Sequence, residues 1–151
     1  MTIELITTST PELHEAMACL LPQLSRSAKP MSEADVERFL AQGGVHLFVF
    51  RPDTADAEGN RPILGMLSLA TFEIPTGVRA WVEDVVVDEA ARGQGAGQSL
   101  VVAAIEHAKK IGARTVDLTS RPSREAANRL YQRAGFKLRE TNVYRVTLEQ
   151  K

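Results

Sequence analysis

A glycine-rich turn, Arg92-Gly93-Gln94-Gly95-Ala96-Gly97, separates a predicted strand from a predicted helix. The strand ends in Val85–Val87, an apolar β-branched triplet typical of a buried strand. Amides in the first turn of a helix lack intrahelical acceptors, and the helix dipole favours negative charge there. Glycine lets the backbone approach a phosphate closely and adopt a positive φ. The pattern therefore predicts an anion-binding turn.

Two common phosphate-binding motifs do not fit this turn. A P-loop would need Lys and then Ser or Thr after its last glycine, but Gln98 and Ser99 follow Gly97. The dinucleotide-binding fingerprint G-x-G-x-x-G would need its third glycine at the position of Gln98, and it normally opens a fold rather than following half of one. A turn that binds no ligand is the other interpretation of this motif taken alone.

Two motifs at matching spacing carry a family resemblance. Arg92-x-x-Gly95-x-Gly97 resembles the acetyl-CoA signature, Q/R-x-x-G-x-G/A, of the GNAT-type N-acetyltransferases. Asn128-x-x-Tyr131-x-x-x-Gly135-Phe136 is similar to a later helix of that family, in which an Asn and a Tyr precede a Gly-Phe pair. The resemblance is strong over residues 83–136 and topological before them. Together the motifs favour a ligand-binding turn.

The resemblance implies a role for each residue of these motifs. The backbone of Val85–Val87 is expected to bind the pantetheine arm of acetyl-CoA, and the amides of Gly93–Gln98 its pyrophosphate. Asn128 is expected near the pantetheine or thioester end, and Tyr131 beside the thioester sulfur as a catalytic residue. Arg124 stands where many relatives have Asn, and could reach a CoA phosphate or lie in solvent. The implied cofactor-binding residues are Val85, Val86, Val87, Arg92, Gly93, Gln94, Gly95, Ala96, Gly97, Gln98 and Asn128.

An acyl transfer to an amine needs a base, because an amine with a pKa of about 10.4 is almost entirely protonated at pH 7. Glu83 and Asp84 precede the apolar triplet in the strand that should border the acceptor cavity. Adjacent strand residues face opposite ways unless a bulge intervenes, so one of the two should enter the cavity. Glu83 is the predicted catalytic base. The alternative is that both are strand charges paired with Arg79 or Arg61.

The hydrophobic pattern predicts the elements that position these residues. The first half is expected to contain a strand at 3–7, helices at 11–21 and 32–43, and strands at 45–50, 63–72 and 78–87. The second half is expected to contain a helix at 97–111, a strand at 115–119, a helix at 122–135 and one or two strands within 136–148. A strand, a helix and a strand form a βαβ unit, so the strands on either side of the glycine-rich helix should be parallel.

The predicted fold is a single α/β domain over residues 1–151. Its central mixed sheet carries helices on both faces. The resemblance further implies that the sheet splays at the cofactor site.

Composition narrows the function further. The net charge of -1 gives no reason to expect nucleic acid or a membrane surface as a partner. The single cysteine, Cys19, fits a reducing compartment, so a cytoplasmic location is expected, and its helical position suggests a buried thiol. His14, His46 and His107 have no metal-ligand spacing, and His107 is expected on the solvent face of its helix. No metal is expected.

The sequence thus predicts an N-acetyltransferase that moves acetyl from acetyl-CoA to a primary amine by direct attack. The acceptor, a small molecule or a peptide, cannot be read from the residues, and a longer acyl donor stays open. The sequence leaves the oligomeric state open, and the resemblance allows a homodimer because dimers are common among relatives. The alternative is a non-catalytic CoA-binding sensor or structural domain of the same fold.

Overall fold

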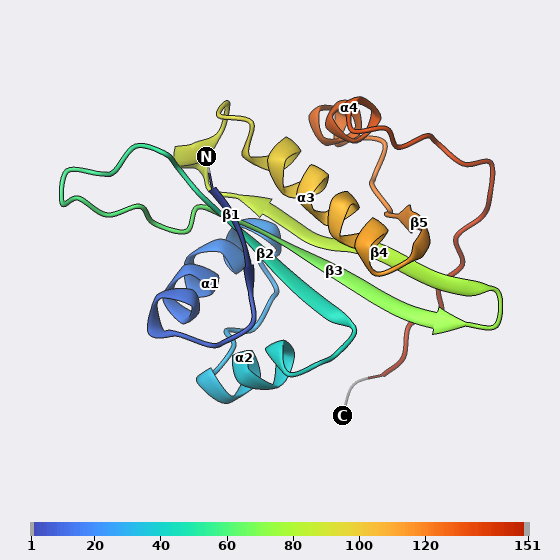
Figure 1. The fold of residues 1–151 in the computed structure, drawn as a ribbon, viewed down its shortest axis with the longest axis horizontal. Coiled ribbons are helices and arrows are strands. Elements are labelled where there is room, and N and C mark those ends of the chain that lie inside the picture. The colour runs from blue at the N-terminus through green and yellow to red at the C-terminus, as the bar shows by residue number, and fades with distance from the viewer. Residues whose placement is uncertain (1, 150–151) are drawn as a thin grey trace.

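Five strands form one sheet in the order β1-β2-β3-β4-β5 in the computed structural model, which describes residues 2–149 (Figure 1). The pairs β1–β2, β2–β3 and β3–β4 are antiparallel, and the pair β4–β5 is parallel. The strands are β1 (Thr2–Ile6), β2 (Val45–Arg51), β3 (Gly65–Ile74), β4 (Gly77–Val87) and β5 (Ala113–Asp117). The helices are α1 (Pro11–Leu24), α2 (Glu33–Leu40), the short 3-10 helix η1 (Glu89–Ala91), α3 (Ala96–Lys110) and α4 (Glu125–Arg133). The predicted mixed sheet and βαβ unit are confirmed.

Helices cover both faces of this sheet, as Figure 1 shows with α1 and α2 on one side and α3 and α4 on the other. Alternation along β2 explains the two layers, because side chains of a strand point alternately to opposite faces. Leu47 and Val49 belong to the cluster formed with α1 and α2, whereas Phe48 and Phe50 pack in the cluster that includes Leu100 of α3. The α/β fold with two helical layers was therefore predictable from the sequence.

Local capping signals locate the helix starts. The Thr10 side chain accepts a hydrogen bond from the Leu13 amide, and Pro11 occupies the first helical position of α1. Ser32 and Asp35 form a reciprocal capping box at the start of α2. Within residues 2–149, no helix is both long and apolar enough to cross a bilayer.

The expectations for the C-terminal segment and for Cys19 were wrong. Residues 136–148 form no strand, and residues 137–149 are exposed throughout. Strand propensity stabilises a segment only when a neighbouring strand supplies hydrogen bonds and packing, and this segment has no such neighbour among the described residues. Cys19 is exposed rather than buried, with its Sγ atom 4.0 Å from Asp88 Oδ2.

His107 is also not on a solvent face. Its ring lies 4.5 Å from the ring of His46 on β2 and 5.5 Å from that of Phe48, centroid to centroid. His46 Nε2 is 3.2 Å from Thr71 Oγ1, while His107 Nε2 is buried without a hydrogen-bond partner in the described chain. Burial, and then the neighbouring His107, lower the pKa of His46 below 6.5.

The histidine pair predicts acid sensitivity. A lowered folded-state pKa means that the unfolded chain binds more protons below about pH 6.5, so stability falls as pH drops from there towards the folded pKa. We expect the free energy of unfolding from urea titration to decrease between pH 7.5 and 5.5, by at most about 1.4 kcal/mol per pH unit for one proton. His46→Gln should flatten this dependence. His14→Gln is the control, and an unchanged slope in His46→Gln would exclude the pair as its source.

Candidate active site

The sheet opens between β4 and β5. Pairing between these strands runs only from Val78–Ala113 to Trp81–Asp117. The rest of β4, Val82–Val87, has no β5 residue beside it. Backbone N–H and C=O groups on that side of β4 are therefore available to an extended ligand, which can bind as an added strand does. The predicted pantetheine residues, Val85–Val87, lie in this open stretch.

A β-bulge lies just before those residues. Ser68 of β3 faces Glu83 and Met66 faces Val86, so two residues of β4 oppose the single Leu67. Asp84 occupies the bulge with φ 49°, the left-handed region that non-glycine residues seldom adopt. Such strain is commonly found at functional sites.

The bulge changes which face each β4 side chain reaches. Val82 before the bulge and Val85 after it both pack on the side of α3, although a regular strand would turn positions three apart to opposite faces. Val86 packs with α1 and α2. By alternation from Val82, Glu83 lies on the α1–α2 side. Both Glu83 and Asp84 are exposed, so the structure leaves a carboxylate of this pair accessible on that face.

The glycine-rich turn connects β4 to α3 through η1. Gly93 has φ 81° and Gly95 has φ 76°, so both require the conformation that glycine adopts most easily. Gly95 is the N-cap of α3 and supplies no side-chain hydrogen bond to the first turn. The amides of the first helical residues therefore remain available to an anion. The turn therefore lies between a strand and a helix start, as the sequence predicted.

Residues inside the first turn of α3 also have packing roles. A Cβ atom at Gly97 would lie 2.8 Å from Leu130 Cδ1, so the absence of a side chain lets α4 pack closely against α3. Ala96 is buried, and Arg92 is exposed with its guanidinium 4.0 Å from the Glu89 carboxylate. Gln98 Oε1 is buried and has no hydrogen-bond partner in the described chain. A buried unpaired acceptor at this position is a group that a bound ligand could satisfy.

Asp88 stabilises this turn, a role that sequence reasoning missed. Its Oδ1 accepts the Ala90 amide at 2.8 Å, and its Oδ2 accepts Nε2 of Gln23 from α1, also at 2.8 Å. These hydrogen bonds lower the pKa of the Asp88 carboxyl, the Ala90 contact contributing most. An Asp two residues before a turn amide is a recognisable capping pattern that could have indicated the first contact. The second depends on the packing of α1.

Removing this carboxylate should loosen the turn. We expect Asp88→Ala to lower the free energy of unfolding by about 1 kcal/mol, the usual cost of a lost cap. Asp88→Asn keeps the acceptor oxygen and should lose less. Urea titration of both variants measures the difference, and equal losses would show that the charge rather than the cap contributes the stability.

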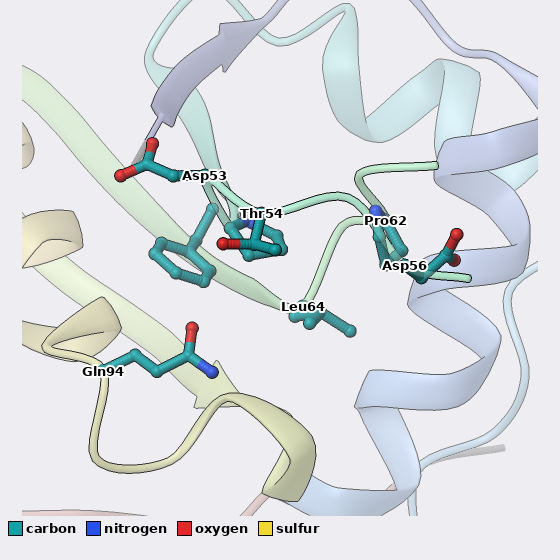
Figure 2. Close-up of a pocket in the computed structure, with 8 residues that line it drawn as sticks. Asp53, Thr54, Asp56, Pro62, Leu64 and Gln94 are labelled. Carbon is teal, nitrogen blue, oxygen red and sulfur yellow. The ribbon is translucent and has the colours of Figure 1, made fainter. Parts of the chain in front are cut away.

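Figure 2 shows a hollow beside the turn, between Gln94 and the loop that joins β2 to β3. Asp53, Asp56 and Leu64 line it from the loop side, and Gln94 lies across from them. Two carboxylates disfavour a phosphate group in the hollow itself, since like charges repel. The amides at the start of α3 are therefore the better candidate for an anion site.

Tyr131 and Asn128 lie on α4, which packs against α3. Tyr131 is buried in the cluster against which Val85 and Val87 pack, and its ring meets Phe136 edge-on at 6.0 Å. Burial raises the pKa of Tyr131 above 10, and the nearby Arg124 cation opposes part of that change. The phenol is therefore an O–H donor at neutral pH. The Asn128 side chain donates to Arg121 O at 3.0 Å, which ties α4 to the loop before it.

Val86 packs on the side of α1 and α2. Val85, Val87, the start of α3 and Tyr131 belong to one hydrophobic cluster on the α3 side. Glu83 reaches the opposite face. Asn128 has a structural hydrogen bond that the sequence did not indicate.

The sequence and the fold are both similar to those of known acetyltransferases. Residues 12–136 match the Acetyltransferase (GNAT) family. The chain is 36% identical over 121 residues to glucosamine 6-phosphate N-acetyltransferase 1 of Oryza sativa subsp. japonica, covering 78% of this chain and 70% of that protein. Its fold is similar to that of an acetyltransferase of Trypanosoma brucei, with TM-score 0.75, 26% identity, and coverage of 97% and 100% of the two chains.

A second solved structure has the same fold at lower identity. Glucosamine-6-phosphate N-acetyltransferase of Arabidopsis thaliana has TM-score 0.76 and 19% identity, over 97% of this chain and 99% of that one. The match over residues 12–136 spans both motifs, the split between β4 and β5 and the glycine-rich turn. The chain belongs to the GNAT acetyltransferase family.

Proposed function

We propose that this protein transfers an acetyl group from acetyl-CoA to a primary amine, by direct attack within a ternary complex. The observation that carries the proposal is the stretch Val82–Val87 of β4, which has no partner on the β5 side. The chain continues from it through η1 and the glycine-rich turn into α3, whose first turn has no side-chain cap. One ligand that combines an extended amide-containing arm with a pyrophosphate would fit both parts. Acetyl-CoA is such a ligand.

The residues of the site fit this donor chemically. The open edge of β4 offers backbone partners to the pantetheine amides, and the first-turn amides of α3 suit the pyrophosphate. A Cβ atom added at Gly93 would meet nothing within 4 Å, so the turn leaves open space where a ligand could approach. The unpaired Gln98 Oε1 is a further acceptor within the same turn. Asn128 is proposed to contact the cofactor through its side-chain carbonyl oxygen, since its amide nitrogen donates to Arg121 O.

In the proposed reaction, the amine nitrogen attacks the thioester carbonyl and the thiolate of CoA leaves. Glu83 would attract the ammonium form of the acceptor and receive its proton, directly or through water. A backbone amide of β4 near Val85 would stabilise the oxyanion that forms on the carbonyl. Tyr131 would donate a hydrogen bond to the departing sulfur. No covalent bond to the enzyme is involved.

The acceptor is proposed to be a small amine. The rice relative is named for glucosamine 6-phosphate, which makes this sugar phosphate the first acceptor to test. Thiol release in the presence of acetyl-CoA and a panel of amino sugars, amino acids, polyamines and peptides would identify the substrate. A protein that binds acetyl-CoA and releases no thiol with any amine would be a sensor, and the enzymatic proposal would be wrong.

The donor site can be tested with matched glycine variants. Gly93 and Gly112 have φ 81° and 85°, a Cβ atom added at either would meet nothing within 4 Å, and they flank opposite ends of α3. Asn tolerates this backbone conformation, so both can be replaced without severe strain. We expect Gly93→Asn to weaken acetyl-CoA binding at least tenfold, about 1.4 kcal/mol, because its side chain occupies the ligand's approach. Gly112→Asn should bind normally. Calorimetry with equal affinities for both variants would contradict the pyrophosphate assignment.

A further inference from the structure

The β3–β4 hairpin extends past α1 and α2, and aromatic side chains lie outside the core in this extension (Figure 1). Trp81, the only tryptophan of the sequence, is half-buried and belongs to neither hydrophobic cluster of the described chain. Phe72 is 46% exposed. By contrast, Val86 near the other end of β4 packs with α1 and α2. Large aromatic side chains that are left outside a core commonly belong to a binding surface.

Alternation along the two strands brings these aromatic side chains to the same face as the proposed base. Leu67 and Leu69 of β3, and Ala80 and Val82 of β4, pack on the α3 side, so the residues between them point to the other face. We call the residues on that face the hairpin row; they form the direct cross-strand pairs Ser68–Glu83, Ala70–Trp81 and Phe72–Arg79.

The order of side chains along the hairpin row gives a linear pattern. Glu83, Trp81 and Arg79 follow one another at intervals of about 7 Å, the rise of two strand residues. Ala70 contributes only a methyl group beside Trp81, so it leaves room for a ligand against the indole. A molecule lying along this face would therefore meet a carboxylate, an aromatic ring and a guanidinium in that order.

Two arginines meet at the far end of the row. Arg79 donates to Thr76 Oγ1 at 3.0 Å, and Arg114 of β5 donates to Thr76 O at 3.2 Å. A Cβ atom at Gly77 would lie 2.8 Å from Arg114 Cδ, so the glycine makes room for this side chain. Within residues 2–149 neither arginine forms an ion pair, and alternation turns the nearby Glu73 to the opposite face. Two neighbouring guanidinium groups without a carboxylate suit an anionic ligand group.

We propose that the hairpin row selects the acceptor: a primary amine on a ring with an apolar face, with an anionic group on the far side of the ring. The ammonium group contacts Glu83, the ring lies against Trp81, and Arg79 and Arg114 hold the phosphate or carboxylate. This inference rests on the proposed acetyl transfer and names its acceptor class. Glucosamine 6-phosphate, for which the rice relative is named, has this chemistry, and so does an aromatic amine with a carboxylate.

The first test compares amines that differ in one group. Glucosamine 6-phosphate is compared with glucosamine, and 4-(aminomethyl)benzoate with benzylamine; 3-aminopropyl phosphate carries the anion without a ring. We expect at least one of the two anionic ring amines to exceed its neutral partner, and the ringless phosphate, by about tenfold in kcat/KM for thiol release. The pair that shows the difference identifies the ring as a sugar or an aromatic. The inference is overturned if neither anionic ring amine is preferred.

The second test removes the proposed anion contact. Arg79→Gln should lower kcat/KM about tenfold for the preferred anionic amine and leave its neutral partner unchanged, because only the anion loses a charged donor. Arg38→Gln, on the exposed surface of α2, is the matched control and should change neither. Equal losses with the anionic and the neutral amine, or no loss with either, would show that Arg79 does not bind the anion, which overturns its assignment.

The third test observes the ring contact without any acetyl transfer. Because Trp81 is the only tryptophan, its fluorescence reports on this face alone. With CoA present, glucosamine 6-phosphate or 4-(aminomethyl)benzoate should change the emission, and 3-aminopropyl phosphate should not. Trp81→Phe keeps an aromatic ring and should retain turnover, whereas Trp81→Leu should lose about tenfold in kcat/KM for the ring amine, with circular dichroism to show that both are folded.

The fluorescence also separates a failure of this inference from a failure of the proposed function. An emission change without thiol release from any amine would support the hairpin row as a binding surface and contradict acetyl transfer. Thiol release from other amines, with no emission change from either ring amine, would support acetyl transfer and overturn the hairpin row as the acceptor site.

Discussion

Glu83→Gln is expected to lower kcat/KM for the amine by roughly 10²-fold or more while acetyl-CoA binding stays unchanged. The substitution keeps the size of the side chain and removes its charge. Glu83 is assigned as the base because alternation from Val82 turns it to the face that α1 and α2 cover, opposite Tyr131 and the glycine-rich turn. The loss should shrink as pH rises towards the pKa of the amine, since less of the acceptor then needs a base.

Asp84→Asn is the matched control for this prediction. Asp84 has φ 49°, a conformation that Asn tolerates as well as Asp, so the bulge should survive the change. If Asp84→Asn is the damaging variant and Glu83→Gln is silent, the bulge presents Asp84 to the acceptor and the assignment of the base is wrong. If neither matters, deprotonation uses solvent, and the two acids are structural.

Tyr131→Phe is expected to reduce kcat by roughly 10²-fold under conditions where chemistry limits the rate. A thiolate whose thiol has a pKa near 8.5 is a weaker base than a phenolate, so transfer of the Tyr131 proton to the leaving thiolate is uphill by about 1.5 pKa units, or about 2 kcal/mol, even at ordinary values. Burial raises the pKa of Tyr131 further and makes full transfer still less favourable. The hydroxyl is therefore expected to act as a hydrogen-bond donor to the sulfur.

Two measurements separate this role from packing. Acetyl-CoA affinity should be nearly the same in Tyr131→Phe, because the ring and its edge-on contact with Phe136 remain. Activity should show no decline from ionisation of Tyr131 below about pH 10, since its pKa lies above that value. Tyr144, which is 88% exposed, provides the control variant Tyr144→Phe. If Tyr131→Phe has wild-type turnover, the hydroxyl has no role in the reaction and Tyr131 is a packing residue.

Patterns that act over short distances were read correctly from the sequence. The caps at Thr10 and Ser32 and the glycines before α3 each depend on a backbone conformation set by a few neighbouring residues. The strand at 45–50 was also predicted, and the glycine-rich turn with its later helix indicated the family. These features are local, so the residue types determine them without knowledge of the rest of the chain.

Features that depend on contacts between distant segments were missed or left open. The ring of His107 packs on His46, 61 positions earlier in the sequence, because α3 crosses that face of β2. Gln23 reaches Asp88 only because α1 packs beside the turn. The faces of Val85 and Val86 follow from the bulge opposite Leu67 of β3, since a single extra residue reverses the alternation after it.

The C-terminal segment, residues 137–149, shows the same dependence on distant contacts. Its residues have the strand propensity from which we expected a strand, and yet no strand of the described chain pairs with them. The sequence by itself determined the turn, the helix starts and the two-layered core, because caps, glycine conformations and side-chain periodicity act within a few residues. Only the tertiary structure decided the extent of β4–β5 pairing, the faces of Val85 and Val86 after the bulge and the exposure of residues 137–149, because hydrogen bonds between strands join segments whose separation the local sequence does not encode.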